Sequence, residues 1–252
     1  MKNVQKLIAS LFMAGLLSAP LVAQTSSAAR YDNDIQARVT KQLADKKEFR
    51  NVQAATEDGI VTLTGTVDLY QQKLDAAKKA RKTDKVSGVR NLIEVSSAAP
   101  DDQIEARLDR KIYFDRVGYF DNRFNHVTVD VKDGVATLSG ETMDYVARDS
   151  AVAIANRMPG VKDVVNNITV SPTSGFDDQI RVQATRAIYR DPVLSRYATD
   201  PAAPIRIVVS NGKLSLYGTV ASAMDKQIAG MRAGQVFGVF SVQNNLDVVK
   251  GS

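Results

Sequence analysis

Apolar and polar residues alternate on both sides of a short turn, and this arrangement occurs three times along the chain. In the clearest copy, Val127, Val129 and Val131 precede the pair Asp133-Gly134. Alternation with a period of two predicts a strand with one buried face, and an Asp-Gly pair predicts a tight turn into a second strand. In every copy a second glycine follows the first by six residues, which gives the pairs Gly59 and Gly65, Gly134 and Gly140, and Gly212 and Gly218.

Each predicted hairpin lies between two amphipathic stretches. Before the hairpin, an aspartate precedes apolar residues about four positions apart, as Asp177 precedes Ile180 and Ala184. This spacing predicts a helix that is capped by the aspartate and packs one face. After the hairpin come two alanines four residues apart, such as Ala151 and Ala155. They predict a second helix lying close to the sheet, and we expect the second glycine of each pair to leave room for it.

The chain is therefore predicted to be α+β, with three tandem αββαβ modules. Each module is expected to form a small mixed three-stranded sheet with two helices on one face. We place the modules at residues 30–97, 100–171 and 176–249. A further glycine precedes the last strand at Gly160 and Gly238, whereas the first module has Lys85 there. We expect the nearby Gly88 to take the place of that glycine.

The N-terminal residues have the pattern of a secretory signal. Two lysines precede an apolar run over residues 7–17, and small residues follow that run. The run is shorter than the roughly 20 residues that cross a membrane, which favours cleavage over a retained anchor. We expect a signal peptide at residues 1–23, cleaved after Ala23, with Ala28 and Ala29 as alternative sites.

Composition argues against several classes of function. The formal charge of +5 falls to +3 when Lys2 and Lys6 of the signal are removed, which is a small surplus for a nucleic-acid binder. The chain has no cysteine, and its single histidine, His126, is expected at the start of a strand. A zinc site or a histidine-activated nucleophile would lack its usual partners. We therefore expect a non-enzymatic protein with no metal, no cofactor and no nucleic-acid partner.

The second helix of the first module carries a cluster of positive charge. Near an anionic lipid surface each Lys or Arg contributes about 1 kcal/mol of attraction, so several together give weak peripheral binding. The alternative is an ordinary solvated helix face with Asp75 and Asp84 as counter-charges. The candidate lipid-binding residues of this helix are Lys73, Lys78, Lys79, Arg81, Lys82 and Lys85.

A second candidate is the connection between the first helix and the hairpin of the second module, where aromatic residues alternate with arginines. Aromatic rings enter a membrane interface while guanidinium groups meet phosphate, and both are also common at protein contacts. The alternative is that Tyr113 and Phe114 complete the core while the others pack between modules. The candidate lipid-binding residues of this connection are Arg116, Tyr119, Phe120 and Arg123.

An asparagine occurs at the same position of all three last strands, as Asn91, Asn166 and Asn244. An amide side chain repeated on a strand could bind a ligand. It more often satisfies the backbone of a neighbouring loop, which is the interpretation we favour.

These features together resemble the BON domain family. The resemblance rests on the order of elements, the paired glycines and the similar endings at residues 89–95, 164–170 and 242–248. Three tandem copies are similar to the osmotically inducible, exported members of that family. The resemblance implies a bacterial, periplasmic and non-enzymatic protein that associates with phospholipid membranes or other components of the cell envelope.

Two hypotheses about function follow from the residues and the resemblance. The first is an envelope-associated periplasmic protein that contacts an anionic phospholipid membrane peripherally through the two candidate sites. The alternative is a soluble periplasmic protein that binds protein partners and protects them during stress, as a chaperone does. The sequence does not determine the oligomeric state.

Overall fold

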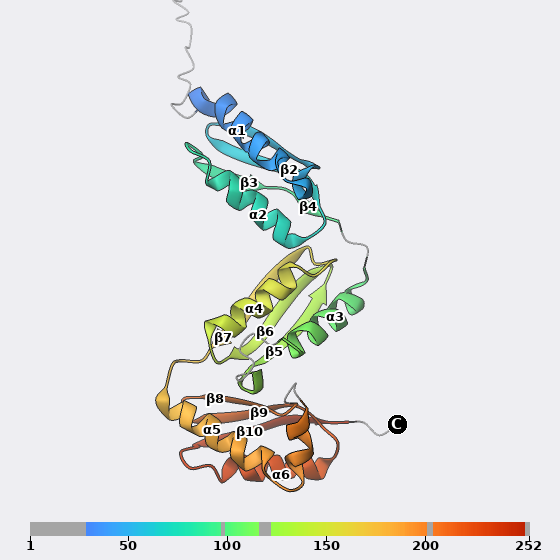
Figure 1. Ribbon diagram of the computed structural model, residues 1–252, viewed down its shortest axis with the longest axis vertical. Helices are drawn as coiled ribbons and strands as arrows, with labels where there is room; N and C mark the ends of the chain where they lie inside the picture. Colours follow the sequence, from blue (N-terminus) through green and yellow to red (C-terminus); the bar gives the residue numbers. More distant parts are fainter. Residues whose placement is uncertain (1–28, 97–98, 116–121, 201–203, 250–252) are drawn as a thin grey trace, which may run out of the picture.

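The structure is a computed structural model that describes residues 29–96, 99–115, 122–200 and 204–249. Three modules follow one another along the long axis of the molecule (Figure 1). Each has the predicted order of helix, strand, strand, helix and strand, so the α+β prediction is confirmed. The predicted signal peptide lies outside the described residues.

Module one has a last strand that is interrupted. Its elements are η1 (Ala29–Tyr31), α1 (Asp32–Ala44), η2 (Lys47–Phe49), β1 (Val52–Glu57), β2 (Ile60–Val67), α2 (Tyr70–Arg81), β3 (Gly88–Asn91) and β4 (Glu94–Val95). β1 pairs antiparallel with β2, whereas β3 and β4 both pair parallel with β2. The single last strand expected from the sequence is therefore divided into two short strands along the same neighbour.

Modules two and three each have one continuous last strand. The elements of module two are α3 (Asp101–Tyr113), η3 (Asn122–Phe124), β5 (His126–Lys132), β6 (Val135–Thr142), α4 (Tyr145–Asn156) and β7 (Asp163–Val170). The elements of module three are α5 (Gly175–Tyr189), η4 (Leu194–Thr199), β8 (Arg206–Ser210), β9 (Lys213–Val220), α6 (Ala223–Gly234) and β10 (Ser241–Val248). His126 begins β5, as predicted.

The second strand of each hairpin is the central strand of its sheet. In module two, β6 pairs antiparallel with β5 on one side and parallel with β7 on the other. The parallel pairing requires a crossover, which α4 supplies. Both helices pack on one face, where Ile104 and Leu108 of α3 share a fully buried core with Leu138 of β6 and Ala155 of α4. Each module has its own core of this kind.

The aspartate at the start of each first helix stabilises the hairpin turn and does not cap its own helix. In module two Asp133 and Gly134 have φ values of 55° and 80°, as a tight hairpin turn requires. Both of their backbone N–H groups donate to the carboxylate of Asp101, at 2.6 and 2.9 Å. Asp32 and Asp177 accept equivalent pairs of hydrogen bonds. The predicted capping role was wrong, because these carboxylates instead join the first helix to the turn.

The second glycine of each pair makes room for a strand, and not for the second helix as predicted. Gly65 has φ +107°, and a Cβ atom placed on it would lie 1.9 Å from the carbonyl oxygen of Asn51. Gly140 and Gly218 stand in the same relation to the carbonyl oxygens of His126, the first residue of β5, and Pro204, which precedes β8. The close neighbour is the backbone that enters the hairpin, which explains why only glycine fits.

Lys85 itself makes the turn before the last strand of module one. Its φ is 67°, whereas Gly88 is not among the residues with positive φ. The expectation that Gly88 replaces the missing glycine was therefore wrong. The ammonium group of Lys85 lies 3.4 Å from the centre of the Tyr31 ring, and this cation–π contact offsets part of the cost of a left-handed lysine.

Candidate functional site

The basic residues of α2 form one exposed stripe. Leu74, Lys78 and Lys82 follow one another at intervals of four residues, and Arg81 lies beside them, so their side chains share one side of the helix. All four are exposed, and we call the three basic ones, Lys78, Arg81 and Lys82, the basic stripe. Lys73 and Lys79 lie half-buried at its margins, while Lys85 is held against Tyr31.

The two acidic residues near the basic stripe are engaged elsewhere. Asp75 accepts a hydrogen bond from the side chain of Gln71 at 3.1 Å. Asp84 faces Arg38 of α1, with 3.9 Å between the charged atoms. Within the described part of the chain, neither Lys78 nor Lys82 forms an ion pair. Among the described residues, these two lysines of the stripe are therefore not paired with a carboxylate.

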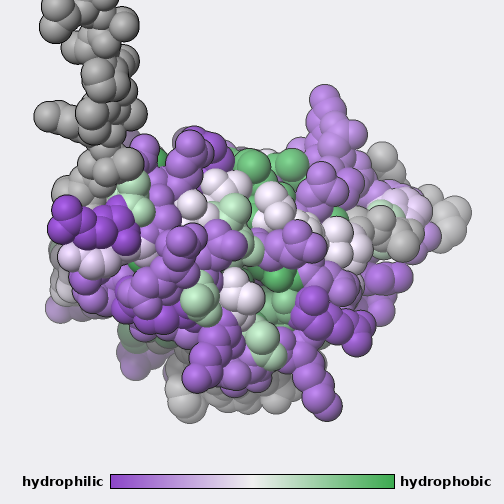
Figure 2. Space-filling model, turned by 90° about the horizontal axis from the view of Figure 1, so that it is seen from above, coloured by the Kyte–Doolittle hydropathy of each residue, from purple (hydrophilic) through white to green (hydrophobic). Residues whose placement is uncertain are grey.

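The end of the molecule formed by module one is largely hydrophilic. Figure 2 looks down the long axis from that end and shows mostly polar side chains, with smaller hydrophobic groups between them. No helix in the described part of the chain combines the length and the apolar character needed to span a membrane.

The aromatic connection of module two is described only in part. Arg116, Tyr119 and Phe120 lie outside the described residues, so their candidate role stays a prediction. Arg123 lies over the ring of Tyr189 in module three, 5.8 Å from its centre. Phe124 packs against the core of module three. The described part of this connection thus joins two modules, which was the alternative interpretation of the segment.

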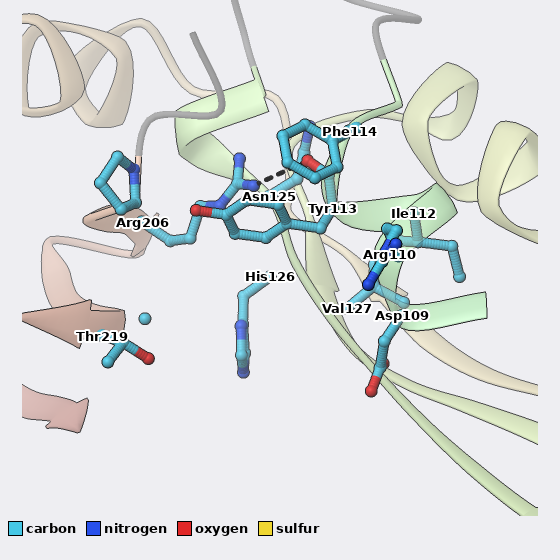
Figure 3. A pocket seen from close by; sticks show the side chains of 12 residues that line it. Asp109, Arg110, Ile112, Tyr113, Phe114, Asn125, His126, Val127, Arg206 and Thr219 are labelled. Carbon is cyan, nitrogen blue, oxygen red and sulfur yellow. Dashed lines mark hydrogen bonds between the residues drawn. The ribbon is translucent and has the colours of Figure 1, made fainter. Parts of the chain in front are cut away.

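A cleft of about 500 Å³ lies between modules two and three. Tyr113 and Phe114 form one wall, with their rings edge to face at 5.0 Å (Figure 3). Phe114 is 57% exposed, so the expectation that it completes the core was wrong. The module-three side is formed by residues at the ends of β8 and β9, including Arg206 and Thr219. We call this space the inter-module cleft.

A buried guanidinium group and a histidine lie side by side in the inter-module cleft. Arg206 is only 5% exposed, donates to the backbone oxygen of Tyr113 at 3.2 Å and lies over the Tyr113 ring. Burial lowers the pKa of the Arg206 guanidinium. The ring of His126 stacks on Tyr217 of module three, with 3.9 Å between ring centres. Burial, and secondarily the charge of Arg206, lower the pKa of His126.

One exposed aromatic group was not predicted from the sequence. Phe237 and Phe240 lie between α6 and β10 and are 86% and 76% exposed. The Phe240 ring stacks against Phe176 at 6.0 Å, and we call these three residues the phenylalanine tip. A position-by-position comparison of the modules could have found it, because the other two carry smaller or polar residues there. The positions of Phe237 and Phe240 hold Asp84 and Ser87 in module one and Pro159 and Lys162 in module two.

The repeated asparagine joins the last strand to the second helix. Asn91 donates from its amide nitrogen to the backbone oxygen of Lys73 at 2.8 Å, and Asn244 donates to that of Lys226 at 2.7 Å. The amide oxygen of Asn166 accepts from the backbone N–H of Ile168. The amides thus satisfy backbone groups, as favoured above, although in two modules the backbone belongs to a helix and not to a loop.

The candidate sites in the described part of the chain are exposed surfaces and one cleft. Among the described residues, no three His, Asp or Glu side chains lie close enough together to hold a metal ion. The fold and its sites define a tandem-repeat α+β protein with a charged helix face, an aromatic tip and a cleft between modules. The BON domain family model matches residues 31–97, 100–172 and 177–250. The chain therefore belongs to the BON domain family.

Two relatives and one solved structure are similar to the chain. The chain is 29% identical over 147 residues to Osmotically-inducible protein Y of Escherichia coli, which covers 54% of this chain and 71% of that protein. It is 26% identical over 147 residues to Outer membrane lipoprotein DolP of Haemophilus influenzae, which covers 56% and 71%. Among solved structures, the C-terminal domain of CdsD of Chlamydia trachomatis matches at 13% identity, covering 86% of this chain and 96% of that one. The TM-score of that match is 0.25, a value too low to support comparison of the two.

Proposed function

We propose that this protein is a non-enzymatic periplasmic protein of the cell envelope that binds anionic phospholipid surfaces peripherally. The observation that carries the proposal is the basic stripe of α2. Its lysines are exposed, and the two nearest carboxylates are engaged with Gln71 and Arg38. Charge that is not neutralised within the protein attracts an anionic surface.

The phenylalanine tip supports the same proposal by a different interaction. Phe237 and Phe240 expose most of their ring surface to solvent. An aromatic ring that enters the interfacial region of a membrane loses this unfavourable hydration. Each contact is weak by itself, because a few basic residues contribute about 1 kcal/mol each. Two weak contacts on one chain reinforce each other when both can engage at once.

The relatives support an envelope setting. One is an outer membrane lipoprotein and another is osmotically inducible, according to their names. Membership of the BON domain family supports the same envelope setting.

The phenylalanine tip also favours a second candidate function, in which the protein binds other proteins of the periplasm. Exposed aromatic residues often act as anchors in protein interfaces. This alternative includes a chaperone-like role, with the tip in contact with unfolded segments. In contrast to the lipid proposal, it assigns no role to the basic stripe.

Sedimentation with vesicles tests the lipid proposal directly. We expect the protein to bind vesicles that contain anionic phospholipid, to bind zwitterionic vesicles weakly, and to release as salt screens the charges. The stripe variant changes Lys78 and Lys82 of the basic stripe, and Lys79 at its margin, to Glu. It should weaken binding at least tenfold, since three attractive charges of about 1 kcal/mol each become repulsive. The matched control changes three other exposed lysines of module one to Glu, namely Lys41, Lys46 and Lys47.

The two sets of variants separate the functions. If the control variant loses as much binding as the stripe variant, net charge and not the stripe is responsible. If neither charge reversal affects binding but Phe237→Ser with Phe240→Ser abolishes it, the contact is hydrophobic and the stripe has no part in it. The protein could instead bind no vesicles under any condition and yet suppress the aggregation of unfolded proteins. That result would establish the protein-binding alternative.

A further inference from the structure

α6 presents an apolar stripe on the side that faces away from the core of module three. Met224, Ile228 and Met231 follow one another at intervals of four and three residues, so their side chains lie on one face of the helix. Met224 is 67% exposed and Met231 is 53% exposed. The opposite face of α6 carries Ala229 and Ala233, which are fully buried in the core. Both methionines therefore remain available for contact with another molecule.

A groove runs beside this apolar stripe. It has a volume of about 350 Å³, with Ile228 and Met231 on one side and Pro192 and Val193, which lead into η4, on the other. Val193 is 41% exposed. Module two contacts module three through η3 and β8, whereas α6 lies on the side of module three that points away from module two (Figure 1). The described residues therefore leave this groove open, and we call it the α6 groove.

Only module three has three large apolar residues along this face of its second helix. Counted from the second glycine of each hairpin, the equivalent positions in module one hold Gln71, Asp75 and Lys78. Those in module two hold Val146, Ser150 and Ala153. The three modules share one fold, so the fold itself does not require apolar residues at these positions. Their presence on α6 indicates a contact outside the module.

The surface that borders the α6 groove is basic. Within residues 186–199 and α6, the acidic residues are Asp191 and Asp225. Asp191 pairs with Arg232 and Asp225 pairs with Arg196. The two aspartate side chains are 3% and 2% exposed, whereas those of Arg232 and Arg196 are 43% and 53% exposed. A partner therefore meets the guanidinium side of both pairs.

Arg190 adds positive charge that has no such counter-charge. It is exposed where the chain leaves α5, and it forms no ion pair among the described residues. Arg186, one turn earlier on α5, is also exposed. The next acidic residue along the chain, Asp200, interacts electrostatically with Arg206 and Tyr113 at the boundary with module two. The α6 groove is therefore an apolar surface bordered by positive charge.

We propose that the α6 groove binds one amphipathic helix of a partner protein, with apolar side chains against the methionines and Val193 and acidic side chains beside Arg190. Apolar residues spaced by four and three are those through which two helices pack. The face from Met224 to Gln235 is about 16 Å long, which matches three turns of a partner helix. Methionine side chains adapt their shape to different apolar partners.

Two other occupants fit these features less well. A flat lipid surface would cover the methionines but leave the groove beside Pro192 and Val193 unfilled. A second copy of this chain would bring its own arginines towards Arg190, and like charges oppose association. The proposal does not rest on the membrane contact, because it uses neither the basic stripe nor the phenylalanine tip.

Fluorescence anisotropy of labelled peptides, titrated with the full chain, tests the site. The probe is a peptide of about 18 residues, or five helical turns, with leucine at alternating intervals of three and four. Glutamate borders the leucine row on both sides, and alanine fills the other positions. One control peptide has lysine in place of every glutamate, and another has the residues of the probe in scrambled order. We expect the acidic probe to bind 1:1 and each control to bind at least tenfold more weakly.

Met231→Glu should weaken binding of the acidic probe at least tenfold, because it places a carboxylate in the α6 groove. Since Met231 is half exposed, this change leaves the core intact. The matched control is Val146→Glu, because Val146 is exposed to a similar degree, 59%, on the second helix of module two. It should change binding less than twofold.

Arg190→Glu provides a result that misfolding could not produce. It should weaken binding of the acidic probe at least threefold and strengthen binding of the lysine peptide, because the sign of the charge beside the groove is reversed. Lys46→Glu is the matched control, since Lys46 is exposed just beyond the first helix of module one. It should affect neither peptide.

Several results would overturn the assignment. Failure of the acidic probe to bind would do so, as would equal affinity for the scrambled or the lysine peptide. Loss of vesicle binding in Met231→Glu, with unchanged affinity for the probe, would assign the stripe to a lipid surface. A wild-type dimer in analytical ultracentrifugation that Met231→Glu dissociates would assign the groove to a second copy. The peptide titrations contain no lipid, so failure of this proposal is distinguishable from failure of the membrane proposal.

Discussion

A single backbone oxygen determines the residue at Gly65. The carbonyl of Asn51 would lie 1.9 Å from any Cβ atom at this position, and the φ of +107° is one that other residues rarely adopt. The sequence indicated that glycine was required, because the spacing recurs three times. It could not indicate the reason, since the spacing of the glycines does not identify the element that approaches them.

Substitution of the two glycines of module one should give opposite results. Gly65→Ala should destabilise the module by about 2–3 kcal/mol, because the backbone must move to relieve the contact with Asn51. Gly88→Ala should change stability by less than about 0.5 kcal/mol, since an added Cβ would meet only a side-chain carbon of Ile60 at 3.9 Å. Thermal unfolding of both variants measures the difference. Equal loss at the two positions would contradict this explanation.

At the scale of elements, the hairpins were the most predictable part of the fold. Alternation and the Asp-Gly or Asn-Gly turn act over a few residues, so the local sequence predicts the hairpin. The carboxylate that holds the turn comes from the first helix and was not predicted in that role. The joining of the last strand to the second helix was less predictable, because Asn244 on β10 donates to Lys226 on α6, 18 residues earlier. A recurrent asparagine indicated that a polar group was needed but not where its partner would be.

Neighbouring asparagines of β10 allow this contact to be tested. Asn244→Asp removes the donor and brings a carboxylate towards the backbone oxygen of Lys226, so we expect a loss of about 1–2 kcal/mol. Asn245 is exposed, and Asn245→Asp should cost less than about 0.5 kcal/mol. Urea unfolding of module three within the full chain measures both. Similar values for the two variants would show that added negative charge, and not the lost hydrogen bond, is responsible.

At the scale of the whole molecule, the sequence suggested that part of the aromatic connection packs between modules, but it could not reveal which residues of modules two and three meet. The residues that meet are distant along the chain, with 93 positions between Tyr113 and Arg206. Nothing in local periodicity pairs them, so the inter-module cleft was not predicted even though Tyr113 and Phe114 had been singled out. The basic stripe was predictable because one helix contains all of it. The phenylalanine tip was less predictable than the basic stripe and more predictable than the inter-module cleft, since a position-by-position comparison of the modules reveals it.

We expect His126 to make this docking sensitive to pH. Its ring stacks on Tyr217 across the boundary, and burial together with the charge of Arg206 lowers its pKa. A lowered pKa means that the folded state favours the neutral ring. The stability that the stack contributes is therefore complete above the unfolded pKa of about 6.5 and is lost as the pH falls through the lowered value.

Acidification should accordingly separate modules two and three before either one unfolds, because the protonated ring would lie beside the buried guanidinium of Arg206. Small-angle scattering between about pH 7.5 and pH 5 should show an increase in the radius of gyration at the acidic end. His126→Phe keeps a ring for stacking on Tyr217 but cannot take up a proton, so this variant should remain docked over the same range. Equal expansion of both proteins would assign the transition to other titrating groups. If the wild-type dimensions stay constant, the stack with Tyr217 does not control the docking.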